Sequence, residues 1–107
     1  LGDVYKRQAY TMSKSAIHGL VRNTAAMYAN DKIRCNAVAP GGIATEILEN
    51  LNDVDEKGIE VVMRGPKLDK MVASAEEIAA NLLFLASDQA SNINGQILVS
   101  DGGLTNM

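Results

Sequence analysis

Two side chains near the start of the chain could together carry out proton transfer. Tyr10 and Lys14 lie four residues apart at the head of a long helical pattern, so a helix would place both on one face, within reach of one bound molecule. A cation beside a phenol stabilises the phenolate, so Tyr10 could donate or accept a proton near neutral pH. The sequence therefore predicts an acid/base pair, which the elements around it must hold in place.

The helix that would carry this pair spans Ala9 to Tyr28. Its apolar residues recur at the spacing of one broad buried face, and they are Ile17, Leu20, Val21, Thr24 through its methyl group, Ala25 and Tyr28. Asn30-Asp31 supplies the turn that ends it. Ile33 to Ala39 is rich in β-branched and small residues and is closed by Pro40-Gly41-Gly42, which predicts a buried strand running into a loop. A helix followed by a buried strand is typical of half a parallel α/β unit.

The segment from residue 41 to about residue 74 is the least regular part of the chain. Thr45 could cap a short helix over Glu46 to Leu51, and a second could cover Val54 to Arg64. Two glycines and a proline interrupt the pattern. We therefore expect a mobile excursion over a site rather than part of the core.

A second helix and a second strand follow this excursion. Ser74 and Glu77 have capping-box spacing, and the helix after them would bury an apolar face made of Ile78, Leu82 and Leu85, widened by Leu83 and Phe84. Asn94-Gly95 predicts a turn, Gln96 to Ser100 a short strand, and Asp101-Gly102-Gly103 the turn that closes it.

The predicted order is thus helix, strand, excursion, helix, strand. Two strands cannot make an independently stable sheet, and their composition predicts burial on both faces against neighbours that these residues do not supply. We therefore interpret residues 9–107 as part of a larger domain. Leu1 to Gln8 has neither helical nor strand periodicity and no apolar signal-peptide region, so we interpret residues 1–8 as a leader of doubtful origin.

The composition excludes several classes of function. Lys and Arg number 10 against 13 Asp and Glu, a net charge of −3, so there is no basic surface for nucleic acid or for an anionic membrane. One cysteine excludes an internal disulfide and a cysteine-rich metal site. No apolar run approaches the roughly 18 residues of a membrane span. We expect a soluble, cytoplasmic protein.

Four motifs occur in order at plausible spacings. They are Tyr10-x-x-Ser13-Lys14, then Ile33-Arg34-Cys-Asn36-x-Val38-x-Pro40-Gly41-x-Ile43-x-Thr45, then Phe84-Leu85-Ala-Ser87-Asp88, and last Asn94-Gly95-Gln96 to Asp101-Gly102-Gly103. Over about residues 9 to 103 they resemble the C-terminal part of the short-chain dehydrogenase/reductase family. A second Tyr-x-x-x-Lys occurs at Tyr28 and Lys32, but it spans the predicted helix end. The spacing of Lys14, not Lys32, to Pro40 suits the family.

The resemblance implies an α/β fold, the C-terminal part of a doubly wound parallel-sheet (Rossmann-like) domain that binds NAD or NADP. It implies that Tyr10 is the acid/base for a small-molecule carbonyl/alcohol pair and that Lys14 bonds the nicotinamide ribose. The loop Pro40-Gly41-Gly42-Ile43-Ala44-Thr45 would hold the carboxamide through the Ile43 backbone and the Thr45 hydroxyl. In open α/β sheets, cofactors bind at the ends of strands where such loops lie. A homo-oligomer, tetramer or dimer, is implied for the full-length protein.

The sequence also departs from the family. It contains no glycine-rich phosphate loop, no residue that chooses between NAD and NADP, and neither the catalytic serine about thirteen residues before the tyrosine nor the catalytic asparagine. The alternative is a catalytically inert fragment or interaction segment, because a chain without the pyrophosphate site should bind dinucleotide poorly.

Other polar residues have simpler interpretations. Ser13 is a small helix residue, His18 is solvated, Cys35 is a core residue, and Asn36 is a structural hydrogen-bonding group. Glu76 and Glu77 suit a helix start and need no metal. Met63 and Met71 could line a lipophilic pocket or only fill gaps.

Overall fold

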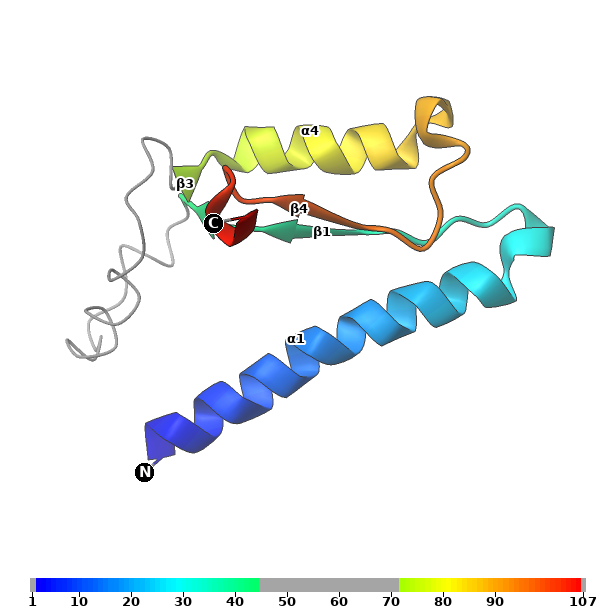
Figure 1. Ribbon diagram of the computed structural model, residues 1–107. Helices are drawn as coiled ribbons and strands as arrows, with labels where there is room; N and C mark the ends of the chain where they lie inside the picture. Colours follow the sequence, from blue (N-terminus) through cyan, green and yellow to red (C-terminus); the bar gives the residue numbers. More distant parts are fainter. Residues whose placement is uncertain (1, 45–71, 107) are drawn as a thin grey trace. The chain divides into compact units, whose positions relative to one another are not determined.

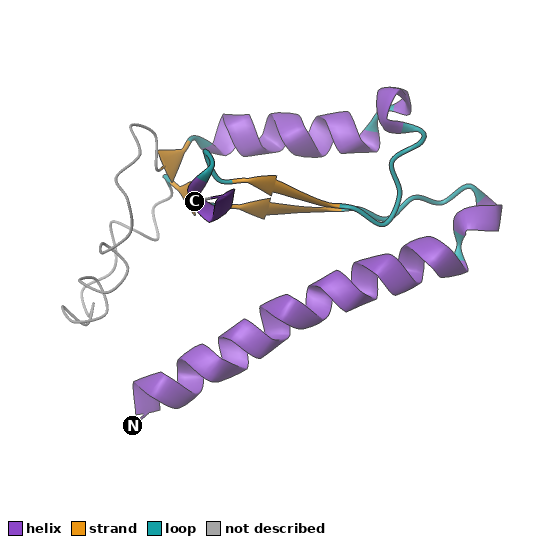
Figure 2. Ribbon diagram, viewed as in Figure 1, coloured by secondary structure: helices purple, strands orange, loops and turns teal. Residues whose placement is uncertain are grey.

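The computed structural model describes residues 2–44 and 72–106 (Figure 1). Along the chain these residues form a helix, a strand, a helix and a strand, with short elements between them. The long elements are the helices α1 (Gly2–Met27) and α4 (Ala75–Ala86) and the strands β1 (Ala37–Pro40) and β4 (Ile97–Ser100). The shorter ones, also visible in Figure 2, are η1 (Ala29–Asp31), β2 (Gly42–Ile43), β3 (Val72–Ala73), η2 (Asp88–Ala90) and η3 (Leu104–Asn106). The predicted excursion, with Thr45, Met63 and Met71, lies outside the described residues, apart from its two ends.

The described residues fall into two compact units. The first contains the chain up to Val38 together with Leu82–Leu98, and the second contains the described part of Ala39–Asn81 together with the residues from Val99 onward. Tyr10 and Lys14 therefore belong to the first unit, and the loop after β1 belongs to the second.

Both small sheets are parallel. In the sheet β1-β4, the Ala37 amide donates to the Gln96 carbonyl and the Gly41 amide donates to the Ser100 carbonyl, at 2.9 and 3.0 Å. From the first hydrogen bond to the second, the residue numbers of donor and acceptor both increase, so the two strands run in the same direction and are parallel. In the second sheet Gly42 pairs with Val72 and Ile43 with Ala73. The predicted parallel α/β arrangement is confirmed.

The first helix begins earlier than predicted. It starts at Gly2 rather than Ala9, so the predicted start of this helix is wrong. The reason is intrinsic propensity: Lys6, Arg7 and Gln8 are strong helix formers without an apolar period, and a helix already formed extends at low cost. The origin of residues 1–8 stays a prediction.

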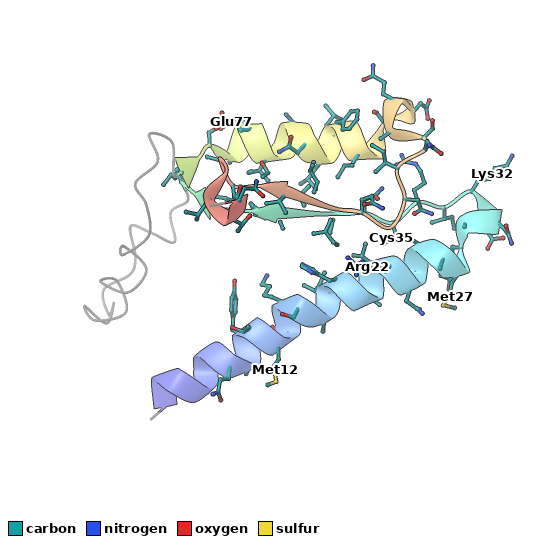
Figure 3. All side chains as sticks on the ribbon, in the orientation of Figure 1. Met12, Arg22, Met27, Lys32, Cys35 and Glu77 are labelled. Atoms are coloured by element: carbon teal, nitrogen blue, oxygen red, sulfur yellow. The ribbon has the colours of Figure 1, made fainter. Side chains whose placement is uncertain are left out.

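The buried face of α1 is narrower than predicted. Among its described side chains only Val21 and Ala25 are buried. Thr24 is half-buried, whereas Ile17, Leu20 and Tyr28 are exposed. Met12 and Met27 also project freely from the helix (Figure 3). Apolar spacing predicts which side a helix can bury, but burial requires a covering element, which the described residues supply only near Ala25.

The first strand is shorter than predicted and starts at Ala37 instead of Ile33. Residues 33–36 are paired outside a strand ladder: the Cys35 amide donates to the Asn94 side-chain oxygen, and the Ile33 amide donates back to the Tyr28 carbonyl. Ile33 is 51% exposed, so the expected burial is also wrong there. The second strand, β4, lies within one residue of its predicted start.

A capping box starts α4, as predicted. The Glu77 amide donates to the Ser74 hydroxyl oxygen at 3.2 Å, and the Ser74 amide donates to a Glu77 carboxylate oxygen at 2.9 Å. The helix buries Ile78 and Leu85, whereas Leu82, Leu83 and Phe84 are exposed. The predicted apolar face is therefore confirmed at two of its positions and wrong at the other three.

Replacing the cap should weaken the start of this helix. We expect Ser74→Ala to lower the free energy of unfolding by about 1 kcal/mol, because the Glu77 amide loses its partner. Urea denaturation and faster hydrogen exchange at the Glu77 amide would measure the effect. Ser91→Ala is the matched control, since Ser91 is exposed and caps no long helix. Equal effects of the two changes would contradict the cap.

Candidate functional site

The helix brings Tyr10 and Lys14 together, as their spacing predicts. The Lys14 ammonium nitrogen lies 5.5 Å from the centre of the Tyr10 ring, within the range of a cation–π contact. The Tyr10 side chain is 64% exposed, so a ligand can reach it. The helix thus holds a cation beside an exposed phenol.

Ser13 supports the backbone of this turn. Its hydroxyl donates to the Tyr10 carbonyl at 2.7 Å, so the hydroxyl hydrogen is directed to the helix itself. This contact agrees with a helix residue rather than a nucleophile. His18 is exposed, as predicted.

The second Tyr-x-x-x-Lys does not form a pair on one face. The helix ends at Met27, before Tyr28, and Lys32 follows η1 with a φ of 60°. This left-handed residue turns the chain out of the helix. Tyr28 and Lys32 therefore lack the common helical face that Tyr10 and Lys14 share.

The loop after β1 is held at both ends in the second unit. The Gly41 amide donates to Ser100, and the Ala44 amide donates to the Ala73 carbonyl at 2.9 Å. Pro40 ends β1, and Gly42 and Ile43 form β2. Backbone pairing thus fixes Pro40 to Ile43, while Thr45 lies outside the described residues.

Gly41 leaves room for a neighbouring backbone. A Cβ added there would lie 3.0 Å from both the Cα and the Cβ of Asp101, closer than side chains normally approach. The turn after β4 therefore packs directly against the loop, which explains why glycine suits this position.

The Asp101 carboxylate organises that turn. It accepts hydrogen bonds from the Thr105 hydroxyl at 2.7 Å, the Thr105 amide at 2.8 Å and the Gly103 amide at 2.9 Å. The Thr105 hydroxyl and these amides lower the pKa of Asp101 below its ordinary value. Gly102 and Gly103 have φ values of 66° and 94°, so the predicted turn is confirmed. Residues 104–106 form η3 directly after this turn.

Three polar side chains connect distant segments of the first unit. Asn36 donates to the Ile93 carbonyl at 2.8 Å and accepts from the Gln96 amide at 3.0 Å, so its predicted structural role is confirmed. Arg34 and Asn94 also make long-range hydrogen bonds, although the sequence indicated no such role for either. The sequence contained only a weak signal for these two roles, which is that Arg34 and Asn94 each belong to a motif next to a predicted strand. Cys35 is only half-buried.

The part of the chain that the structure describes contains no cluster of three or more His, Cys, Asp or Glu side chains that could hold a metal ion. None of its helices combines the length and the apolar character needed to cross a bilayer.

A protein-family match covers almost the whole chain. A family model described as enoyl-(acyl carrier protein) reductase matches residues 3–105. The chain is 45% identical over 95 residues to 3beta-hydroxysteroid dehydrogenase 2 of Eggerthella lenta, covering 89% of this chain and 36% of that protein. The chain thus spans little more than a third of that relative.

Solved structures give the same result for the fold. A 4-hydroxyisoleucine dehydrogenase complexed with NADH and succinate superimposes with a TM-score of 0.74 at 31% identity, over 94% of this chain and 39% of that one. A 2-deoxy-d-gluconate 3-dehydrogenase from Agrobacterium tumefaciens with bound NADP gives 0.75 at 33%, over 92% and 39%. These proteins have the Rossmann-like fold that the motifs imply, and the present chain corresponds to part of it. The chain belongs to the short-chain dehydrogenase/reductase family.

Proposed function

We propose that this chain is the C-terminal part of an NAD(P)-dependent oxidoreductase that interconverts a carbonyl and an alcohol. The observation that carries the proposal is the pair on α1, with the Lys14 nitrogen 5.5 Å from the centre of an exposed Tyr10 ring. Relatives that hold NADH and NADP support the choice of cofactor.

The residues present fit a nicotinamide cofactor. Lys14 is exposed and carries three N–H donors for ribose hydroxyls. The loop Pro40-Gly41-Gly42-Ile43 presents backbone groups at the end of a parallel strand, where open α/β sheets bind such ligands. Ile43 and Thr45 would hold the carboxamide. The bound nicotinamide would supply or accept the hydride.

Tyr10 would complete the reaction at the substrate oxygen. In reduction its hydroxyl donates a proton to the carbonyl oxygen, and in oxidation the phenolate accepts the proton of the alcohol. The ammonium group of Lys14 stabilises the phenolate that forms in reduction. The substrate is a small molecule with a carbonyl or alcohol group, as in the steroid and sugar dehydrogenases that the chain resembles.

Exposed apolar side chains favour a full-length homo-oligomer, either tetramer or dimer. Leu83 is 73% exposed on α4, and its neighbours in sequence, Leu82 and Phe84, are exposed too; several large apolar side chains exposed on one helix normally become buried against protein. The cytoplasmic location stays a prediction.

A second candidate concerns the 107 residues alone. The same exposed apolar residues, and a sequence without a Gly-x-Gly-x-x-Gly loop, favour an inert segment. Pyrophosphate binding normally requires such a loop at a helix N-terminus.

A fluorescence titration with NADH and NADPH separates the two candidates. We expect no saturable binding by the 107-residue chain and saturable binding by the full-length enzyme that contains it. Saturable binding by the chain alone would contradict the inert segment. Absence of binding by the full-length enzyme would contradict the proposed oxidoreductase.

A further inference from the structure

The loop after β1 packs on the turn that follows β4. The Gly41 amide donates to the Ser100 carbonyl at 3.0 Å, and a Cβ added at Gly41 would lie only 3.0 Å from both the Cα and the Cβ of Asp101. All three residues belong to the second unit. Both partners of each contact are part of this chain, so the full-length enzyme contains both of them.

The shape of this turn depends on the Asp101 side chain. Gly102 and Gly103 have φ values of 66° and 94°, so the chain reverses through two successive left-handed residues, which glycine permits. The Asp101 carboxylate spans the reversal. One of its oxygens accepts from the Gly103 amide at 2.9 Å, and the other accepts from the Thr105 amide at 2.8 Å and the Thr105 hydroxyl at 2.7 Å. Without the carboxylate, the turn would lose all three of these hydrogen bonds.

We propose that Asp101 is a positioning residue for the nicotinamide end of the cofactor, because its carboxylate fixes the turn that supports the loop Pro40-Gly41-Gly42-Ile43. The inference rests on the proposed function of that loop. A loop that loses this support adopts its binding conformation for a smaller fraction of the time, and the apparent dissociation constant of the cofactor rises in inverse proportion to that fraction.

The effect should be confined to one end of the cofactor. In folds of this kind the pyrophosphate binds at a glycine-rich loop after the first strand, and this sequence contains no such loop. The ADP-ribose part of the cofactor therefore binds to residues other than the loop that Asp101 supports. A change at Asp101 should weaken the binding of the whole cofactor and leave the binding of free ADP-ribose unchanged.

Asp101→Ala in the full-length enzyme tests this difference. Alanine keeps the Cα and Cβ that face Gly41 and removes only the carboxylate. Calorimetric titrations would compare the reduced cofactor with ADP-ribose, or with its 2′-phosphate if the enzyme binds NADPH. We expect the dissociation constant of the reduced cofactor to rise about tenfold and that of the ADP-ribose ligand to stay within about twofold of wild type. Equal changes for the two ligands, or no change for either, would overturn the inference, because a general loss of structure does not distinguish the two ends.

Thr105 offers a milder matched pair of variants. Thr105→Val removes the hydroxyl that donates to Asp101 and keeps the branched shape of the side chain, whereas Thr105→Ser keeps the hydroxyl. We expect weaker binding of the reduced cofactor by Thr105→Val and wild-type binding by Thr105→Ser. If Asp101→Ala does not fold, this pair decides the question, and equal dissociation constants for the two variants would overturn the inference.

Hydrogen exchange in the cofactor-free enzyme tests the support without using activity. The Gly41 amide should exchange about tenfold faster in Asp101→Ala than in the wild type. The Ala37 amide, which donates to the Gln96 carbonyl in the same sheet, should keep its rate and is the internal control. An unchanged rate at Gly41 would overturn the inference. A wild-type enzyme that binds neither NADH nor NADPH would instead overturn the proposed function, and the exchange rate at Gly41 would still show whether Asp101 supports the loop.

Discussion

Tyr10→Phe in the full-length enzyme should reduce kcat/KM by about 10²- to 10⁴-fold, the usual contribution of a positioned general acid or base. The change removes one hydroxyl and keeps the ring beside which the Lys14 nitrogen lies at 5.5 Å. The packing of α1 should be unaffected, because the Tyr10 side chain is exposed. Binding of NADH or NADPH should therefore stay within a few-fold of wild type.

Steady-state kinetics and a cofactor titration on the same preparation measure both quantities. Tyr28→Phe is the matched control: it removes the same hydroxyl from the second Tyr-x-x-x-Lys, just beyond the end of α1, and should leave turnover unchanged. Full activity in Tyr10→Phe, or equal losses in the two variants, would show that Tyr10 is not the acid/base.

Arg34→Met should destabilise the protein by about 3 kcal/mol, because hydrogen bonds from a charged donor are strong and their loss leaves acceptors unpaired. The guanidinium donates to the carbonyls of Leu85, Ser87 and Ile93 at 2.8, 3.1 and 3.2 Å. Two of these carbonyls lie at the C-terminal end of α4, where unpaired carbonyls accumulate. The last turn of α4 has no basic residue of its own, so Arg34 also supplies the positive charge that favours a helix end.

Urea denaturation of the full-length enzyme would measure this loss. Arg22→Met is the matched control, because Arg22 is an exposed residue of α1 and surface changes of this kind usually alter stability by less than about 0.5 kcal/mol. Arg34→Lys should recover only part of the stability, since an ammonium group lacks the planar fork. Equal stabilities of Arg34→Met and Arg22→Met would refute this role.

Features that depend on neighbouring residues could be predicted from the sequence. The capping box joins Ser74 to Glu77, and Tyr10 meets Lys14 across one helical turn. The turns at Gly95 and after Asp101 follow from glycine and aspartate chemistry. These contacts join residues at most four apart, or depend on one residue's own φ, so residue type and spacing are enough to predict them. The order of helices and strands follows for the same reason.

Features that depend on contacts across the fold could not be predicted in this way. Apolar spacing marked Ile17 and Leu82 for burial as clearly as Ala25 and Leu85, but a side chain is buried only where another element covers it. Asn94 reaches a carbonyl 69 residues earlier in the chain, and Arg34 reaches partners 51 to 59 residues later. A local sequence pattern cannot predict such pairs, because only folding brings residues so far apart in the chain within hydrogen-bonding distance. The amino-acid sequence thus specifies the meeting of Tyr10 and Lys14 on α1, whereas the tertiary structure decides which apolar side chains are buried and which distant carbonyls Arg34 and Asn94 reach.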